Sequence, residues 1–500
     1  MNLPDSREPR AAVRAWRAGL SALALAALAA CSHQGVQPSV KALDTDRLGV
    51  QGAEPAPVSM TLAPWWEACG DAQLNQLIDQ ALRDSPSMQV TATRLQRVQA
   101  LERLAHAAEM PKVQATGKAE RQRFTEHGLV PPPIAGSTRT IGTLQLEGAW
   151  ELDLFGKLRA EMDAAIGQTR AAEADLQAAR LLLSSQVARQ YVQLGRLQAQ
   201  RMVAQRTLAQ REDMLKLIRQ RVDAGLDTAV ELKQGEGALP DTRQQVEALD
   251  EQIMLARHAL AVLSGQAPNA LDSLTVAFDT LRTPELPQSL PLDLLARRAD
   301  VMAARWRVES ASRQSDAART LFYPNIDLST YAGYNAIGLD RLIKPGSFQW
   351  GLLPAIHLPL FDGDQRMANL SGRVAEQDAA VATYNQTVLQ AVQEVADQLG
   401  SVQAVARQRT EQEAAQRHIE AAYALALERY KAGLGSYLIV LNAETAVLAQ
   451  RRQAVDLQAR ALEVQVNLIR AVGGSLAAPQ PAGATPQASS SSNKSSGDRS

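Results

Sequence analysis

A strand that runs directly into a very long helix occurs twice in this sequence, and this unit restricts the possible folds more than any other feature. Residues 143–154 alternate without interruption between apolar and polar side chains, which is the period of a β-strand. The alanine-rich, proline-free run that follows predicts a helix from Lys157 to about Ala224, roughly 100 Å long at 1.5 Å per residue. The same succession begins again at Phe348. The sequence therefore predicts one elongated body, in agreement with an aromatic content of only 4%.

Further landmarks predict that the whole body is duplicated. Gly225 and Gly433 end the two long helices, and Pro111 and Pro324 precede two shorter strands. The predicted repeats comprise residues 63–280 and 281–475. Strands are expected at about 111–123, 141–155, 324–335 and 347–361, and long helices at about 157–224, 227–265, 364–432 and 436–472. Gly235, Gly237 and Pro240 predict a kink or a break in the helix of residues 227–265.

Valines recur at every seventh position of the second long helix. They are Val374, Val381, Val388, Val395 and Val402. A period of seven keeps one apolar seam facing a partner and imposes a left-handed supercoil. The long helices are therefore expected to pack against neighbours.

The N-terminus has the composition of an export signal. Arginines precede an apolar run at residues 20–30, which ends in Leu28-Ala29-Ala30-Cys31. This ending resembles a bacterial lipobox, which predicts a signal peptide at residues 1–30 and a covalent lipid on Cys31. The alternative is a plain signal peptide with an incidental cysteine. Residues 31–62 are predicted to form an extended tether, and the Ser-rich residues 476–500 a disordered tail.

Composition and residue spacing argue against several classes of function. The net charge is −1, so nothing in the bulk charge would recruit nucleic acid. The six histidines lack the spacing of metal ligands, and the carboxylates are scattered along helix faces. We therefore expect no enzyme activity, no metal site and no cofactor other than the lipid on Cys31.

The alternating strands predict a sheet with one apolar and one polar face. Four strands cannot close a membrane barrel, and open strand edges are not tolerated in lipid, so the strands are expected to be shared between subunits. The apolar, lipid-facing side is expected to carry Leu144, Leu146, Trp150, Trp350 and Leu352. The polar, lumen-facing side is expected to carry Gln145, Glu147, Glu151 and Asp153. The alternative is a soluble sandwich, in which the apolar face would cover a core.

Several motifs resemble those of the outer-membrane factor family of the TolC/NodT type. They are the lipobox, Trp65-Trp66-Glu67, Arg297-Arg298-Ala299-Asp300-Val301, Phe322-Tyr323-Pro324 and Tyr430-x-x-Gly433. The resemblance implies a mainly α-helical chain with membrane-spanning strands, each chain a tandem repeat of strand, strand, long helix and helix. Three chains would form a twelve-stranded barrel continuous with a twelve-helix barrel in the periplasm.

The resemblance also implies which residues form the periplasmic end of the channel. The turns expected to contact an adaptor are Ala224-Gly225-Leu226 and Ala432-Gly433-Leu434. The candidates for the aperture are Asp223, Asp227, Asn442 and Glu444, with capping or solvated surface charge as the alternative reading. Asn442 stands where relatives often carry an acidic residue, and Cys69 where they carry a larger apolar one.

The implied function is a passive exit duct of a tripartite efflux system in the outer membrane. Drugs or other small toxic compounds would arrive from an inner-membrane pump of the resistance-nodulation-division type through a periplasmic adaptor. The chain would then be a homotrimer in contact with outer-membrane lipid. One alternative is a duct for type I protein secretion. Another is a structural coiled-coil lipoprotein, which would not explain the amphipathic strands.

Overall fold

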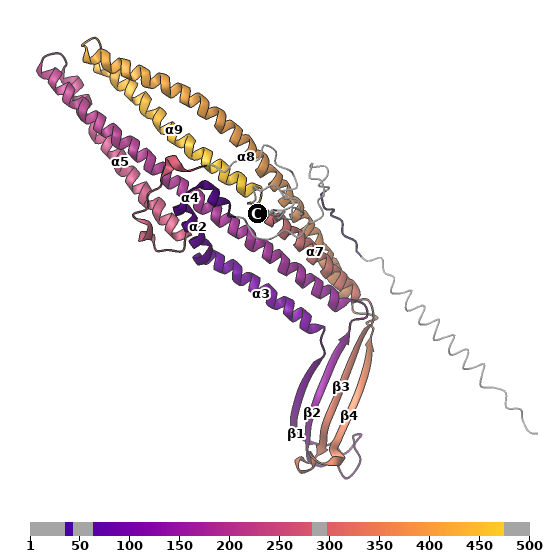
Figure 1. Cartoon of the computed structure of the whole chain (residues 1–500). Coiled ribbons are helices and arrows are strands. Elements are labelled where there is room, and N and C mark those ends of the chain that lie inside the picture. Colours follow the sequence, from indigo (N-terminus) through magenta and orange to yellow (C-terminus); the bar gives the residue numbers. More distant parts are fainter. Residues whose placement is uncertain (1–35, 44–63, 283–297, 475–500) are drawn as a thin grey trace, which may run out of the picture.

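The computed structural model describes residues 36–43, 64–282 and 298–474 of the chain and shows a long helical body with a narrow sheet at one end (Figure 1). Cys31, the signal peptide, the tail and most of the tether lie outside the described residues. None of the described helices combines the length and the apolar character that a membrane span requires.

The sheet has four antiparallel strands in the order β1-β2-β3-β4. They are β1 (Lys112–Arg123), β2 (Thr138–Leu152), β3 (Asn325–Ile337) and β4 (Phe348–His357). Each repeat supplies one adjacent pair, and the pairing of β2 with β3 joins the two repeats. Within the described residues β1 and β4 therefore each have one neighbour, and their outer edges are open.

Four long helices form two hairpins that end far from the sheet (Figure 1). The first hairpin consists of α4 (Lys157–Asp223) and α5 (Ala229–Leu263), and the second of α8 (Gln365–Lys431) and α9 (Tyr437–Ala471). Shorter helices lie nearer the sheet: α2 (Ala72–Asp84), α3 (Pro86–Ala108) and α7 (Ala299–Thr320), with the 3₁₀ turns η2 (Trp65–Cys69), η3 (Pro268–Leu271), η4 (Phe278–Thr280), η5 (Leu339–Arg341) and η6 (Pro345–Ser347). Residues 283–297, which precede α7, lie outside the described residues.

Of the kink or break predicted around Pro240, the break does not occur, because α5 is one helix from Ala229 to Leu263, and the kink stays a prediction. A proline removes one backbone donor, and packing against α4 outweighs that loss here. Gly235 is buried against α4, where an added Cβ would lie 3.0 Å from the Ile218 side chain. Arg211 of α4 donates to the carbonyl of Ala238 (3.2 Å) and to the hydroxyl of Thr242 (2.8 Å), on both sides of the proline.

The valine seam of α8 faces two different helices in succession. Val388 packs with Val301 of α7, whereas Val395 and Val402 contact Leu468 and Val472 at the end of α9. The change occurs where α7 begins and α9 ends. A period of seven thus keeps one face of α8 covered along both partners.

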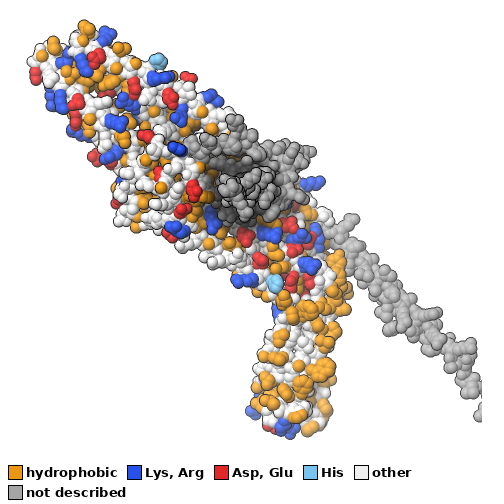
Figure 2. All heavy atoms as spheres, viewed as in Figure 1, with side chains coloured by type: hydrophobic (Ala, Val, Ile, Leu, Met, Phe, Trp, Pro, Cys, Tyr) orange, Lys and Arg blue, Asp and Glu red, His pale blue; other side chains and the backbone are white. Residues whose placement is uncertain are grey.

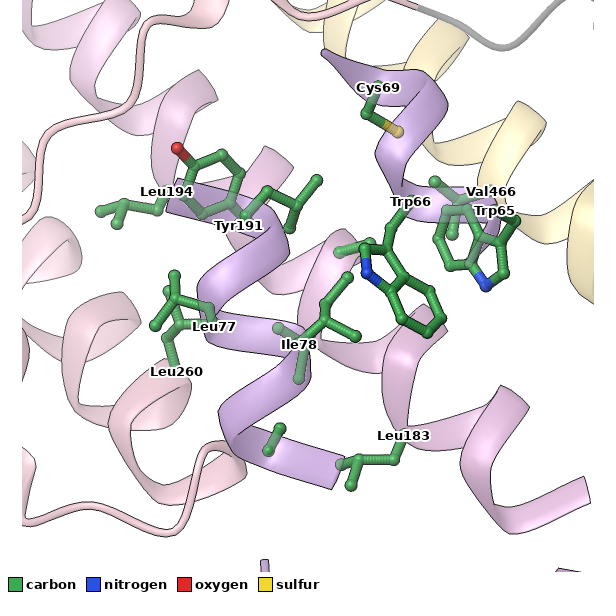
Figure 3. Packing of buried hydrophobic residues seen from close by; sticks show 14 of the residues in the cluster. Trp65, Trp66, Cys69, Leu77, Ile78, Leu183, Tyr191, Leu194, Leu260 and Val466 are labelled. Atoms are coloured by element: carbon green, nitrogen blue, oxygen red, sulfur yellow. The ribbon is translucent and has the colours of Figure 1, made fainter. Parts of the chain in front are cut away.

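The largest core lies midway along the body, where η2 and α2 pack across the long helices (Figure 3). Trp65 and Trp66 insert beside α4, and Ile78 of α2 is fully buried. Asp71 begins α2 by accepting from the backbone of Gln73 and Leu74, and it also accepts from the Tyr191 hydroxyl at 2.8 Å. The Trp-Trp-Glu motif therefore belongs to a belt that ties the N-terminal helices to the body.

Candidate functional site

One face of the sheet is apolar along its whole length and is exposed in the single chain. The strand register aligns Leu146 with Ala332 and Ala332 with Trp350, so these side chains share that face. The predicted lipid-facing residues all lie on it with exposed fractions of 42–72%: Leu144, Leu146, Trp150, Trp350 and Leu352. Figure 2 shows hydrophobic atoms concentrated over the strands, whereas charges cover the helical body. This is an unusually large apolar surface for a protein surrounded by water.

The opposite face carries a chain of hydrogen-bonded polar side chains. Gln114 and Gln145 donate to the two carboxylate oxygens of Glu147, both at 2.7 Å. Gln349 donates to the amide oxygen of Gln145 (3.2 Å), which places β4 in the same network as β1 and β2. Water-filled ducts require such a polar lining.

Gly333 makes the link between Gln145 and Gln349 possible. It stands between these two residues in the register of the sheet. A Cβ at this position would lie 2.5 Å from the Gln145 side chain, which is closer than real contacts allow. A glycine in β3 thus lets the amides of β2 and β4 meet across the strand.

The structure places Glu151, also expected to line the lumen, at the end of β2, and Asp153, expected there too, in the turn from β2 into α4. Asp153 accepts from the backbone N–H groups of Leu158 (3.1 Å) and Arg159 (2.9 Å). Glu151 pairs with Lys157 at 2.7 Å. Both carboxylates therefore stabilise the positive end of the long helix. Their contribution to a lumen remains a prediction.

The two predicted contact turns have the same backbone structure. Gly225 and Gly433 adopt φ values of 73° and 75°, which favour glycine. The N–H of Leu226 donates to the carbonyl of Arg221, and that of Leu434 to Arg429, both at 2.8 Å. These 6→1 bonds define Schellman motifs. Leu226 and Leu434 are 65% and 70% exposed, so each hairpin presents a leucine at its end.

Asp227 connects the two hairpins at their ends. Arg221 of α4 donates to its carboxylate (3.0 Å), and Tyr430 at the end of α8 donates its hydroxyl to the same carboxylate (2.5 Å). The guanidinium also lies 4.6 Å from the centre of the Tyr430 ring. Burial and the Asp227 carboxylate both raise the pKa of the Tyr430 hydroxyl, so Tyr430 is a neutral donor. We call Asp227, Arg221 and Tyr430 the tip latch.

Glu444 makes a second connection deeper between the hairpins. Its side chain is 10% exposed and accepts from Arg211 of α4 at 3.1 Å. Burial raises the pKa of this carboxyl, against the opposing effect of Arg211. The other two aperture candidates, Asp223 and Asn442, are exposed.

Sequence reasoning missed Arg221 and Arg211 and assigned no role to Tyr430. The partners lie far apart in sequence, by 203 residues for Tyr430 and Asp227 and by 233 for Arg211 and Glu444. The only local signal was the Tyr-x-x-Gly string at the end of a helix. Within the described residues, no group of three or more His, Cys, Asp or Glu side chains could hold a metal ion.

Known proteins with this architecture are outer-membrane channels. The sequence model of the outer membrane efflux protein family matches residues 77–266 and again residues 290–474. A multidrug resistance outer membrane protein of Escherichia coli, MdtQ, is 32% identical over 82% of this chain and 87% of its own length. The crystal structure of the outer membrane protein VceC from Vibrio cholerae superimposes with a TM-score of 0.77 at 35% identity, covering 83% of this chain and 99% of VceC. The outer-membrane channel OprN gives a TM-score of 0.79 at 27% identity over 88% of this chain and 99% of OprN.

Proposed function

From the premise that this chain belongs to the outer membrane efflux protein family and acts as an outer-membrane efflux channel, we propose that three copies form one passive duct. Export of drugs or other small toxic compounds is the proposed task, because relatives such as MdtQ are named for multidrug resistance. An inner-membrane pump of the resistance-nodulation-division type would deliver these compounds through a periplasmic adaptor. A lipid on Cys31 would add an anchor in the outer membrane.

The observation that carries this proposal is the sheet of the described residues, which has four strands, two different faces and two open edges. In a bilayer every strand edge must be paired, which requires a closed barrel. Four strands are too few, and three chains supply twelve. The face of Leu146, Trp350 and Leu352 then contacts lipid, and the network around Glu147 lines the water-filled interior.

The tip latch supports a proposal about how the duct is kept shut. The latch connects the α4–α5 turn to the end of α8, so separating the hairpins requires the carboxylate of Asp227 to lose Tyr430. Arg211 and Glu444 must separate as well. An adaptor that contacts the exposed Leu226 and Leu434 would act next to these links and could offset their loss.

The test is single-channel conductance of the purified protein in planar bilayers. We expect a small, stable conductance that rises in Asp227→Ala, because this change removes the acceptor shared by both latch partners. Asp213→Ala is the control, since Asp213 is an exposed carboxylate near the end of α4 that pairs with Lys216 and not with the latch. Protein that never conducts would overturn the duct. Equal conductance of the two variants would overturn the latch and leave the duct standing.

A further inference from the structure

The described part of the N-terminal tether, residues 36–43, is bound to the second repeat through α8. Two side chains of α8, Asp378 and Asn385, make the contacts. The carboxylate of Asp378 accepts from the backbone N–H groups of Ser39 and Val40, both at 3.0 Å, and from the Ser39 hydroxyl at 2.6 Å. The Ser39 hydroxyl and the backbone N–H groups of Val40 and Ser39 hold this carboxylate charged, since they lower the pKa of Asp378.

Asn385 binds the backbone of the same segment farther along. Its amide oxygen accepts from the N–H of Leu43 (2.8 Å), and its amide nitrogen donates to the carbonyl of Lys41 (3.0 Å). An amide that both accepts and donates in this way replaces the backbone of a neighbouring strand. Apart from the Ser39 hydroxyl, the partners are main-chain atoms, so the site recognises an extended chain more than a particular sequence.

The spacing of the two α8 side chains matches the spacing of an extended segment. Asp378 and Asn385 are seven residues apart, so they lie on one side of the helix about 10 Å from each other. Three residues of extended chain, as from Ser39 to Ala42, also cover about 10 Å. The segment therefore runs along α8 in the direction away from the strands, and its N-terminal side points toward them.

The attachment shortens the path to Cys31. Trp65, in the buried belt, is 34 residues from Cys31, whereas Ser39 is eight residues away. For a flexible chain these lengths give root-mean-square distances of about 32 Å and about 16 Å. Asp378 lies about 20 Å from the start of α8, and eight extended residues reach at most about 28 Å. Cys31 can therefore reach the level of the strand ends, where Leu360 and Phe361 are 86% and 90% exposed.

We propose that Asp378 and Asn385 form a backbone clamp that holds residues 39–43 on α8 and so fixes the lipid anchor at the membrane-proximal end of the helical body. The presence of a lipid on Cys31 and its position near the membrane depend on the proposed function. The binding of residues 39–43 to α8 does not. The clamp converts a long tether into a short one without any change in sequence length. Its ligand is a segment of this chain in extended conformation.

The first experiment uses trypsin, because Lys41 lies inside the clamp and its carbonyl is bound by Asn385. Cleavage after Lys41 is followed by mass spectrometry of the full-length protein. We expect Asp378→Ala/Asn385→Ala to be cleaved there at least tenfold faster than the unaltered protein. The matched control is Gln393→Ala/Asp397→Ala, which removes an amide and a carboxylate from exposed positions of the same helix whose side chains bind each other (3.4 Å). Equal cleavage in all three proteins would overturn the clamp.

A second measurement does not depend on protease access. Spin labels on Ala42→Cys and Ala375→Cys report the distance between the segment and α8, and both positions are exposed. We expect a narrow distance distribution that broadens in Asp378→Ala/Asn385→Ala and stays narrow in the control. A distribution that is broad in every protein contradicts the proposal. Neither experiment involves conduction, so a protein that keeps its clamp and never conducts refutes the duct alone.

Discussion

At the scale of single residues, Arg298 explains why the Arg-Arg-Ala-Asp-Val string is present. Its guanidinium is buried and donates to the carbonyl of Ala471 at the end of α9 (2.9 Å). It also binds Asp300 (2.7 Å) at the start of α7 and Glu394 of α8 (3.0 Å). One side chain therefore joins three helices at the point where the valine seam changes partner.

Arg298→Ala should lower the free energy of unfolding by about 1–3 kcal/mol, because it leaves a buried carbonyl without its donor. The two carboxylates are partly exposed, which keeps the loss below that of a fully buried ion pair. Thermal unfolding followed by circular dichroism measures the effect. Arg313→Ala, which removes a partly exposed arginine of α7, should change stability by less than about 0.5 kcal/mol. Equal losses would contradict this role of Arg298.

Cys69 should be nearly inert toward alkylation in the folded protein. Its side chain is buried in the belt. This burial, and to a smaller extent the nearby negative charge of Asp71, raises the pKa of the thiol to about 11. Only about 0.1% is then thiolate at pH 8, against roughly a quarter of an ordinary cysteine. Mass spectrometry after iodoacetamide treatment should show modification at least about 100-fold slower in the native protein than in guanidinium. Similar rates would mean that the belt opens readily.

At the scale of elements, the faces of the strands could be predicted from the sequence, and the contacts between helices could not. A period of two assigns Leu146 and Gln145 to opposite faces whatever the neighbouring strand is. The seam of α8 was likewise visible as a repeat of valines, but nothing in that repeat showed that α7 and α9 would share it. Of the predicted kink or break at Pro240, the break was wrong because the packing that keeps the helix continuous comes from α4.

Two adjacent leucines of β4 test the faces of the sheet with one chemical change. Leu352 lies on the apolar face and Leu353 on the polar face, with 61% and 49% exposure. Leu352→Lys should destabilise the membrane-inserted form by about 2–4 kcal/mol and reduce its amount in outer membranes, because it places a charge against lipid. Leu353→Lys should be tolerated. Gel analysis of heat-resistant assemblies from membranes measures the amount of each variant. A larger loss for Leu353→Lys than for Leu352→Lys would mean that the proposed faces are inverted.

The buried pair of Arg211 and Glu444 predicts the direction of a pH effect on gating. Burial raises the pKa of Glu444 while the hairpins are together, and exposure on opening would return it toward its usual value. The closed state then binds the proton more tightly, so acidification favours closure. Conductance should fall between pH 7 and pH 5, and Glu444→Gln should lose this part of the dependence. An identical pH profile in the two proteins would exclude Glu444 as its source.

At the scale of the whole molecule, the open edges of β1 and β4 predict the number of subunits. Three chains bring twelve strands together, which is an even number within the range of known membrane barrels. Mass photometry or crosslinking of protein extracted in mild detergent should therefore give three copies. Extraction as a stable monomer would refute the shared barrel, whereas the clamp of residues 39–43 would be unaffected.

The open edges of the sheet also affect the newly synthesised chain before it assembles. The described part of a single chain exposes unpaired strand edges beside an apolar face, a combination that favours aggregation in water. The long helices can form from local contacts, but the strands gain a stable environment only at the membrane. Assembly of this protein therefore competes kinetically with misfolding and aggregation. Slow synthesis or a periplasmic holding chaperone should favour assembly, and crowding of unassembled chains should oppose it.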